Sequence, residues 1–338
     1  MASQGHPARA LRDVPTPEFA PEDRALLTTA DGVVQVSLRA RRVRPLTAGW
    51  HGLAVLPGGL VPGRRTDVVV FAFPDGNYPG YDATAYAITR TGSKARVSHL
   101  GWGSRVVRAA HGGFWLDRDE EGPRRVVVRR ASDGTPSGAR LSLRDDQQLI
   151  ADAADVGLLV GPRYNHLGTA GEIALLDRDT SRLLHRVTSA GLVLDARGDR
   201  LVWVPCAGCA PQATWVDRDG STRRRRDAAL HLGGLGVPVA ARVAPNEAHV
   251  ALVVPGYAEG TWDVAVGHLP DSPDARTVTV ALRGLAMAGT GRPPSVSWTP
   301  SGRLLVSDGT RLYVVDRAGR SVHAVDVDVP RHREMAAG

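Results

Sequence analysis

Aromatic residues and lysine are scarce in this chain, and long apolar runs are missing. Of its 338 residues 5% are aromatic and Lys94 is the only lysine, whereas 43% are apolar and 23% are charged. This composition excludes a disordered chain, a collagen and a coiled coil. The longest apolar segment, Val68–Phe73, is far below the roughly 18 residues of a membrane span. The first 25 residues show no apolar segment typical of a secretory signal. We therefore expect no membrane span in this chain.

The net positive charge comes almost entirely from arginine. Lys and Arg together number 42 against 35 Asp and Glu, which gives a formal charge of +7. A nucleic-acid partner would require these arginines to gather on one face. The one visible cluster is Arg223–Arg226, and alternation along a strand would send two of its side chains to each side of a sheet. The charge therefore predicts no nucleic-acid binding.

Helical periodicity is also missing, because no apolar pattern of period 3.6 persists for three turns. Short β-branched segments bounded by Gly, Pro and Asp occur instead along the whole chain, for example Val126–Val128, Leu201–Val204 and Leu312–Val315. Such segments are typical of strands joined by tight turns. The sequence predicts an all-β protein, and the length alone leaves open one large domain or two smaller ones.

One turn phrase recurs along the chain. Asp177–Thr180, Asp217–Gly220 and Asp316–Gly319 each follow one β segment and precede another. Asp and Gly suit such turns because Gly accepts positive φ and Asp bonds nearby backbone N–H groups. Weaker copies extend the series with a spacing of about 40 to 52 residues, which is the length of four short strands with their loops. The interval predicts repeated four-stranded units.

A second phrase precedes these turns by about 20 residues. Its best example is Trp298–Val306, and degenerate copies occur at Ala196–Leu201 and Ala244–Val250. The string Trp-Thr-Pro-Ser-Gly-Arg-Leu-Leu-Val resembles the W-S-P-D-G repeat of TolB-like and WD-repeat-like β-propellers, where it links the innermost strand of a blade to the second. The Gly-His and Trp-Asp signatures of true WD repeats are absent. The resemblance implies a fold rather than an enzymatic activity.

The repeats predict a β-propeller with strands a to d from the centre outward in each blade. Residues 25–47 fit the outer strands of a further blade whose inner strand is not evident. We expect seven blades with an incomplete closure, and six blades with an N-terminal cover is the alternative. The expected organisation is a disordered leader over 1–24, a single domain over 25–330 and a short tail over 331–338. Six full units begin near Trp50, Arg105, Leu149, Gly191, Val237 and Ser295.

Cys206 and Cys209 are the only cysteines. No second cysteine or histidine pair lies near them in the sequence to complete a zinc site. A redox dithiol usually opens a helix, which a β hairpin does not provide. A local disulfide and two reduced thiols therefore both remain open. A cysteine pair in this loop resembles what actinobacterial extracytoplasmic propellers carry, which favours an oxidising compartment, although the chain shows no secretory signal.

Catalytic motifs are missing as well. The sequence contains no G-x-S-x-G, H-E-x-x-H, G-x-x-x-x-G-K-[ST] or sialidase Asp-box pattern, and no cofactor or metal site is expected. We expect a non-enzymatic, monomeric binding or scaffold module that contacts a protein, a peptide or an envelope glycan. The alternative is a propeller hydrolase or lyase that uses Asp82, His166 and Glu259, with or without a divalent metal.

The expected binding surface lies where the b–c and d–a connections share one end of the ring. Several of these connections are longer and richer in aromatic and polar residues than a tight turn requires. Tyrosine and tryptophan combine apolar area with a hydrogen-bonding tip, as do the main contact residues of many interfaces. The candidate binding residues are Tyr78, Tyr81, Asp82, Trp102, Tyr164, Asn165, His166, Tyr257 and Glu259.

Overall fold

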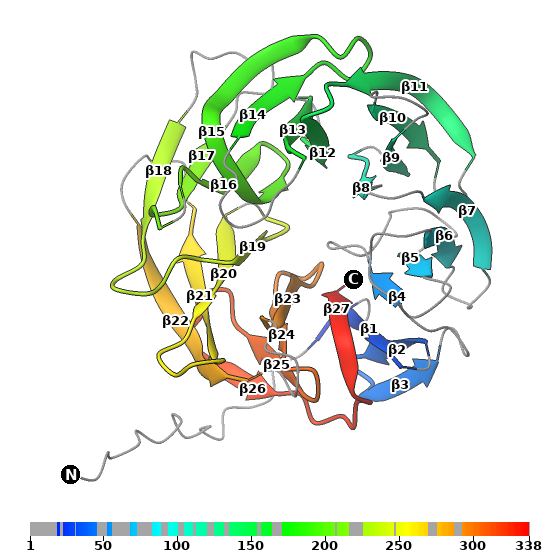
Figure 1. Ribbon diagram of the computed structural model, residues 1–338. Helices are drawn as coiled ribbons and strands as arrows, with labels where there is room; N and C mark the ends of the chain where they lie inside the picture. Colours follow the sequence, from blue (N-terminus) through cyan, green and yellow to red (C-terminus); the bar gives the residue numbers. More distant parts are fainter. Residues whose placement is uncertain are drawn as a thin grey trace.

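Sheets arranged in a ring around a common centre make up this protein (Figure 1). The computed structural model describes residues 19–20, 23–30, 32–45, 53–55, 68–72, 83–88, 94–100, 105–110, 113–119, 125–131, 135–153, 157–163, 171–206, 208–215, 226–246, 248–269, 276–286 and 293–337. Over these residues the regular structure is entirely β, with no helix. The prediction of an all-β protein is therefore confirmed.

Four of the sheets contain four strands each, which follow one another from the centre of the ring outward. In that order, one consists of β27 (His332–Ala337), β1 (Arg24–Thr29), β2 (Val33–Ser37) and β3 (Arg42–Pro45). The next consists of β4 (Leu53–Val55), β5 (Val68–Ala72), β6 (Ala83–Ile88) and β7 (Lys94–Leu100). The third consists of β8 (Arg105–Arg108), β9 (Phe114–Asp119), β10 (Arg125–Arg130) and β11 (Pro136–Leu143). The last consists of β23 (Ser295–Trp298), β24 (Leu304–Ser307), β25 (Leu312–Val315) and β26 (Val322–Ala324).

The remaining eleven strands form one continuous hydrogen-bonded sheet. Its first part consists of β12 (Gln147–Asp152), β13 (Leu158–Pro162), β14 (Gly171–Leu176) and β15 (Leu183–Arg197). Its middle consists of β16 (Arg200–Val204), β17 (Gln212–Trp215) and β18 (Arg226–His231). Its end consists of β22 (Arg276–Leu285), β21 (Trp262–His268), β20 (His249–Pro255) and β19 (Ala240–Val243).

Two irregular features connect the parts of this long sheet. Strand β15 pairs with β14 up to Gly191 and with β16 from Leu192 onward, so it is the outer strand of one group and the inner strand of the next. Strand β18 pairs in parallel with β22 at Leu230 and His231. Without these two connections the sheet would read as three successive antiparallel groups, which is the repeat that the turn phrases predict.

The first and the last strand pair in one sheet. Strand β27 pairs antiparallel with β1, with Leu27 opposite Met335. We expected residues 331–338 to be a short tail and the inner strand of this sheet to be missing, but His332–Ala337 occupies that position. The segment has no β-branched residue, so its extended conformation depends on pairing with β1 rather than on its own propensity.

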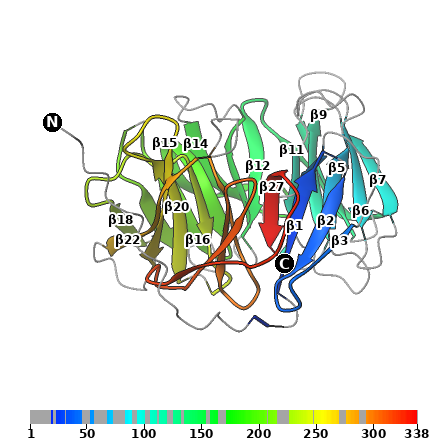
Figure 2. The same ribbon diagram turned by 90° about the horizontal axis from the view of Figure 1, so that it is seen from below.

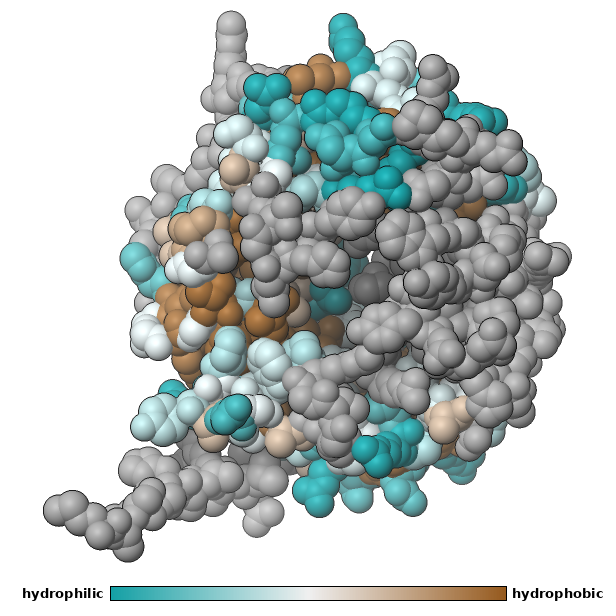
Figure 3. Space-filling model, viewed as in Figure 1, coloured by the Kyte–Doolittle hydropathy of each residue, from teal (hydrophilic) through white to brown (hydrophobic). Residues whose placement is uncertain are grey.

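The antiparallel order gives the ring two distinct faces. In Figure 2 the arrow of β1 points to the top and that of β27 to the bottom. The connections from second to third strand, and from one sheet to the next, therefore lie at the top, which we call the upper face. The remaining connections lie at the bottom, which we call the lower face. The upper face is turned toward the viewer in Figures 1 and 3.

The described recurring turns lie on the lower face. Asp177, between β14 and β15, accepts hydrogen bonds at Oδ1 from the backbone N of Asp179 at 3.0 Å and of Thr180 at 2.8 Å. Asp316, between β25 and β26, accepts from Ala318 N at 3.1 Å and from Arg320 N at 2.8 Å. Hydrogen bonds from Thr180 lower the pKa of Asp177. The phrase at Trp298–Val306 joins β23 to β24, as the resemblance implied.

The hydrophobic core lies between neighbouring sheets. One cluster packs Val202, Trp215 and Leu230 against Val250 and Leu252 of the following group. Because each inner group has a neighbour on both sides, strands such as β20 are buried at five consecutive positions instead of alternating. This arrangement removes apolar area from water on both faces of a sheet, and it explains why the β segments read as continuous apolar runs.

Two carboxylates, one of them fully buried, tie neighbouring groups of strands together near the centre. Asp117 on β9 is fully buried and pairs at 2.9 Å with the Nε of Arg125, which is also buried. Its second oxygen accepts a hydrogen bond from Leu149 N in β12 at 2.8 Å. Asp195 on β15 accepts one from Val243 N in β19 at 2.6 Å. Burial raises the pKa of Asp195, and nearby Arg242 opposes that shift.

Candidate functional site

The candidate binding residues fall into two groups. Tyr257 and Glu259 are described, and both are exposed in the connection between β20 and β21 on the upper face. The structure therefore places these two residues on the expected face. The other candidates lie outside the described residues and stay predictions: Tyr78, Tyr81, Asp82, Trp102, Tyr164, Asn165 and His166.

Tyr257 lies on a loop whose backbone is held by its own hydrogen bonds. Gly256 N donates to Thr261 O at 2.8 Å and Thr261 N donates to Ala258 O at 3.1 Å. The Thr261 hydroxyl donates to the same Ala258 carbonyl at 2.6 Å. The tyrosine side chain is fully exposed, and the only other exposed large hydrophobic residue in the described part is Leu183, at 48%. An aromatic side chain is thus presented to solvent from a fixed backbone.

A second, apolar connection lies beside this loop. Residues Leu232–Val239 lead from β18 to β19, and four of them are half-buried apolar side chains: Leu232, Leu235, Val237 and Val239. Val239 N donates to Val253 O in β20 at 2.9 Å. Gly236 approaches Pro255 so closely that an added Cβ would lie 3.3 Å from its Cδ. The two loops are therefore neighbours, and we call Leu232–Val239 together with Pro255–Thr261 the upper patch.

The upper patch is visible in the surface view. In Figure 3 hydrophobic side chains gather on the visible face, over β19, β20 and the connection that leads to β19. Two glycines give this connection its course, because Gly233 and Gly234 have φ of 58° and 87°, values that other residues rarely adopt. No motif in the sequence marks Leu232–Val239 as a site. The only signal there was the alternation of glycine and large apolar residues in a connection.

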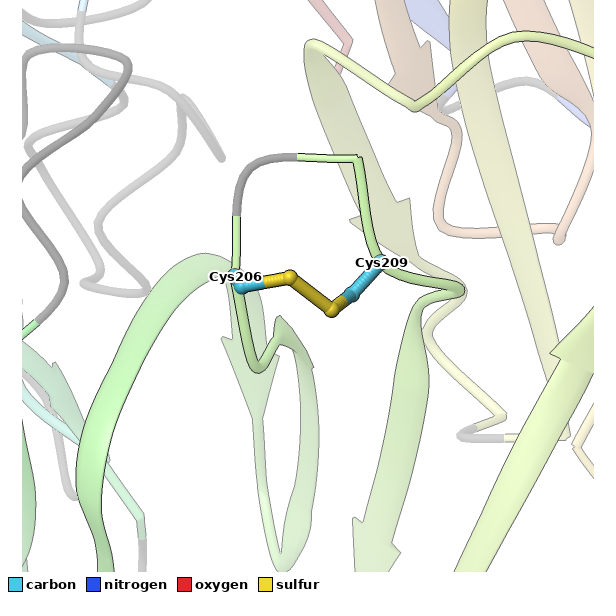
Figure 4. The surroundings of a disulfide bond; sticks show 2 residues. All are labelled: Cys206 and Cys209. Atoms are coloured by element: carbon cyan, nitrogen blue, oxygen red, sulfur yellow. A yellow bond between two sulfur atoms is a disulfide. The ribbon is translucent and has the colours of Figure 1, made fainter.

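A disulfide fixes the neighbouring connection on the same face. Cys206 and Cys209 are bonded to each other in the loop between β16 and β17, with their Cα atoms 5.1 Å apart (Figure 4). Cys209 N also donates to Cys206 O at 3.1 Å. The loop then runs to Pro211, whose carbonyl accepts from Leu230 N at 2.9 Å, next to the start of the upper patch. The cross-link thus restrains the segment that borders the patch.

One pair of side chains has the chemistry of a nucleophile and a base. The Ser307 hydroxyl makes a short hydrogen bond to Nε2 of His332, and Nδ1 of that ring lies 2.9 Å from the Pro330 carbonyl. Gly309 N donates to the Ser307 oxygen at 3.0 Å. Both side chains are buried, at 1% and 5% exposure, and burial lowers the pKa of His332. Because both side chains are buried, the pair is closed to a substrate, and it joins β27 to β24 of the preceding sheet.

The residues expected for metal or acid–base chemistry lie mostly outside the described ranges. No three His, Cys, Asp or Glu side chains come together there in a way that could hold a metal ion. Of the three residues expected for a hydrolase or lyase, only Glu259 is described, and it is exposed. No helix within the described ranges is long and apolar enough to cross a membrane.

Comparison with protein-family models and with curated proteins finds no match. Solved structures do resemble the chain, and three of them do so at low sequence identity. TolB from Acinetobacter baumannii has a TM-score of 0.51 at 13% identity, over 95% of this chain and 67% of that one. Apo AztD from Citrobacter koseri has a TM-score of 0.53 at 11% identity, over 94% and 97%. The β-propeller domain of the Trilobed protease from Pyrococcus furiosus has 0.52 at 10%, over 93% and 98%. Together with the ring of sheets, this similarity shows that the chain has the β-propeller fold.

Proposed function

We propose that this protein is a non-enzymatic binding module that contacts a protein or peptide partner through the upper patch. The observation that carries the proposal is the fully exposed Tyr257 beside the half-buried apolar side chains of Leu232–Val239. Tyrosine supplies large contact area and a hydroxyl at a low cost in side-chain entropy. Leu232, Leu235 and Val239 pack in part against the core and leave the rest of their apolar surface at this loop group, and apolar surface gathered in one place is typical of interaction sites.

The upper patch is also suited to binding because its backbone needs little ordering. The Pro255–Thr261 loop is closed by three hydrogen bonds, and the bordering loop is closed by the Cys206–Cys209 disulfide. A surface that is already ordered loses less conformational entropy when a partner binds. Apolar side chains with few charges among them favour a partner with an apolar segment, such as a peptide, over a strongly charged one.

We further propose that the ring has seven four-stranded blades within a single domain. The support is the four separate four-stranded sheets together with the long sheet, in which β15 serves two neighbouring groups. An extracytoplasmic location is part of the same proposal. It is supported by the Cys206–Cys209 disulfide, because such bonds persist in oxidising compartments.

Site-specific photo-crosslinking tests the binding function. A photoreactive phenylalanine analogue is placed at Tyr257 and, as a matched control, at Leu183, which is the other exposed large hydrophobic residue of the described part and lies at the start of β15, next to a lower-face turn. In cells of the native host we expect one discrete adduct from position 257 and none from position 183.

The nature of the adduct separates the alternatives. A protease-sensitive adduct supports a protein or peptide partner, whereas one that only a glycosidase removes would show that the partner is an envelope glycan. No adduct at position 257, or the same adducts at both positions, would overturn the proposal.

A further inference from the structure

The lower face contains a groove on the opposite side of the ring from the upper patch. It has a volume of about 640 Å³, which falls within the range of about 300–1,000 Å³ that is usual for small-molecule sites. Four segments that are far apart in the sequence form its walls. The lining residues are Phe19, Ala20, Arg39, Ser301, Arg303, Asp316, Arg317 and Ala318.

The groove is built where the segment before β1 meets the turn between β23 and β24. Asp23, just before β1, accepts a hydrogen bond at 2.5 Å from the Ser301 hydroxyl in the β23–β24 turn, and the backbone N of Ala20 donates to the same carboxylate at 3.1 Å. Phe19 is 6% exposed and packs in the core cluster that includes Leu27 and Leu305. The wall contributed by the N-terminal segment is therefore fixed against the last sheet rather than resting loosely on it.

Positive charge dominates the lining. Three arginines face one carboxylate, that of Asp316. This carboxylate is used by its own turn, because it accepts from the backbone N of Ala318, Arg320 and Ser321 and from the Ser321 hydroxyl. No ion pair joins it to Arg39 or to Arg317 over the described ranges. The Asp316 carboxylate is thus engaged by its own turn and neutralises neither Arg39 nor Arg317.

The arginines differ in how firmly they are held. The guanidinium of Arg317 donates from Nε to Gly302 O at 3.2 Å and from Nη2 to Ser301 O. The Arg303 guanidinium lies over the Phe19 ring, with Cζ 6.0 Å from the ring centre. Arg39 is exposed in the β2–β3 turn and has no hydrogen-bond or ion-pair partner in the described part of the chain. Two of the three side chains are therefore oriented in advance, and the third is available.

We propose that this groove binds a small multivalent organic anion through Arg39, Arg303 and Arg317. A guanidinium presents parallel N–H donors that match the oxygens of a carboxylate or a phosphate. Side chains that are already positioned add little ordering cost when the anion binds. The ligand class is a phosphorylated or polycarboxylic small molecule, and the site is independent of the upper patch.

Calorimetry with two named probes, citrate and pyrophosphate, tests this site. The titrations are run on the full chain at constant ionic strength, and each is repeated with Arg39→Gln and with Arg320→Gln. Arg320 is exposed in the neighbouring turn and does not line the groove, so both variants lose one positive charge from the lower face. We expect saturable binding of at least one probe, weakened about tenfold by Arg39→Gln and unchanged by Arg320→Gln.

The remaining outcomes are decisive as well. Absence of saturable binding of both probes to the wild-type chain at millimolar concentration would overturn the proposal. Equal weakening in the two variants would also overturn it, because binding would then follow net charge rather than the groove. Arg39 is exposed, so its replacement is not expected to disturb folding, and equal melting temperatures of the three proteins check this.

Discussion

The upper and lower faces of the ring are the two ends of the same strands, yet they differ in chemistry. On the lower face, the described turns of the recurring phrase are short and are capped by Asp177 and Asp316. On the upper face, the β24–β25 turn is likewise capped by Asp308, whereas the connections around β19 and β20 carry apolar side chains and an exposed tyrosine, and the β16–β17 connection is closed by a disulfide. The hairpins that define the repeated unit need their turns, whereas the opposite connections are freer to vary. The two described copies of the recurring turn phrase thus lie on the lower face, and the upper patch and the disulfide lie on the upper face.

The largest difference between the faces should appear when a lower-face cap is removed. Asp316→Ala deletes the acceptor for three backbone N–H groups and the Ser321 hydroxyl. We expect a loss of about 1–2 kcal/mol in the free energy of unfolding, measured by urea denaturation. Tyr257→Ala on the upper face should change the same quantity by less than about 0.5 kcal/mol.

A control variant distinguishes the loss of the hydrogen bonds in the turn from the loss of a carboxylate charge alone. Asp326 forms an ion pair with Arg41 in which both side chains are largely exposed, so Asp326→Ala should cost less than about 1 kcal/mol. If Asp316→Ala destabilised the chain no more than Asp326→Ala or Tyr257→Ala, the distinction between structural turns and variable connections would fail.

A smaller effect on the free energy of unfolding is expected from a change in pH, which acts on His332 at the start of β27. Burial lowers the pKa of His332, so below its ordinary value of about 6.5 the unfolded chain binds a proton that the folded chain does not. The neutral His332 imidazole therefore contributes its full stabilisation above that pH, and this stabilisation is lost as the pH falls toward the lowered pKa. The free energy of unfolding should therefore decrease between pH 7.5 and 5.5.

Replacing the His332 imidazole identifies the source of this pH dependence. His332→Gln should make the decrease between pH 7.5 and 5.5 smaller than in the wild type. His249, at the lower end of β20, also has a pKa lowered by burial, by His268 and by Arg317. The variant His249→Gln should therefore remove a separate part of the pH dependence of the free energy of unfolding. An unchanged pH dependence in His332→Gln would show that the Ser307–His332 pair is not a pH-sensitive tie.

The sequence predicted those features of the fold that depend on residues close together along the chain. The turn phrases and the Trp298–Val306 phrase predicted the repeated unit, and the inner strands β8, β12 and β23 begin within two residues of the expected positions Arg105, Leu149 and Ser295. These features are local, because a turn aspartate bonds the backbone two to five residues away.

Features that depend on contacts between distant segments were not predictable in this way. Strand β27 is extended only through its pairing with β1. The lower groove requires Asp23 to meet Ser301, 278 residues further along the chain. The upper patch requires the 232–239 connection to lie beside Pro255, and no short motif specifies that contact.

The most direct test of the central claim, that the upper face carries recognition, is the yield of the crosslinked adduct from position 257 in two further variants. Val237→Asp places a charge in the upper patch, and Arg39→Gln removes one from the lower groove. The account predicts that Val237→Asp abolishes the adduct while Arg39→Gln leaves its yield unchanged, with equal melting temperatures as the check on folding. An adduct that persists in Val237→Asp, or that disappears in Arg39→Gln, would contradict it.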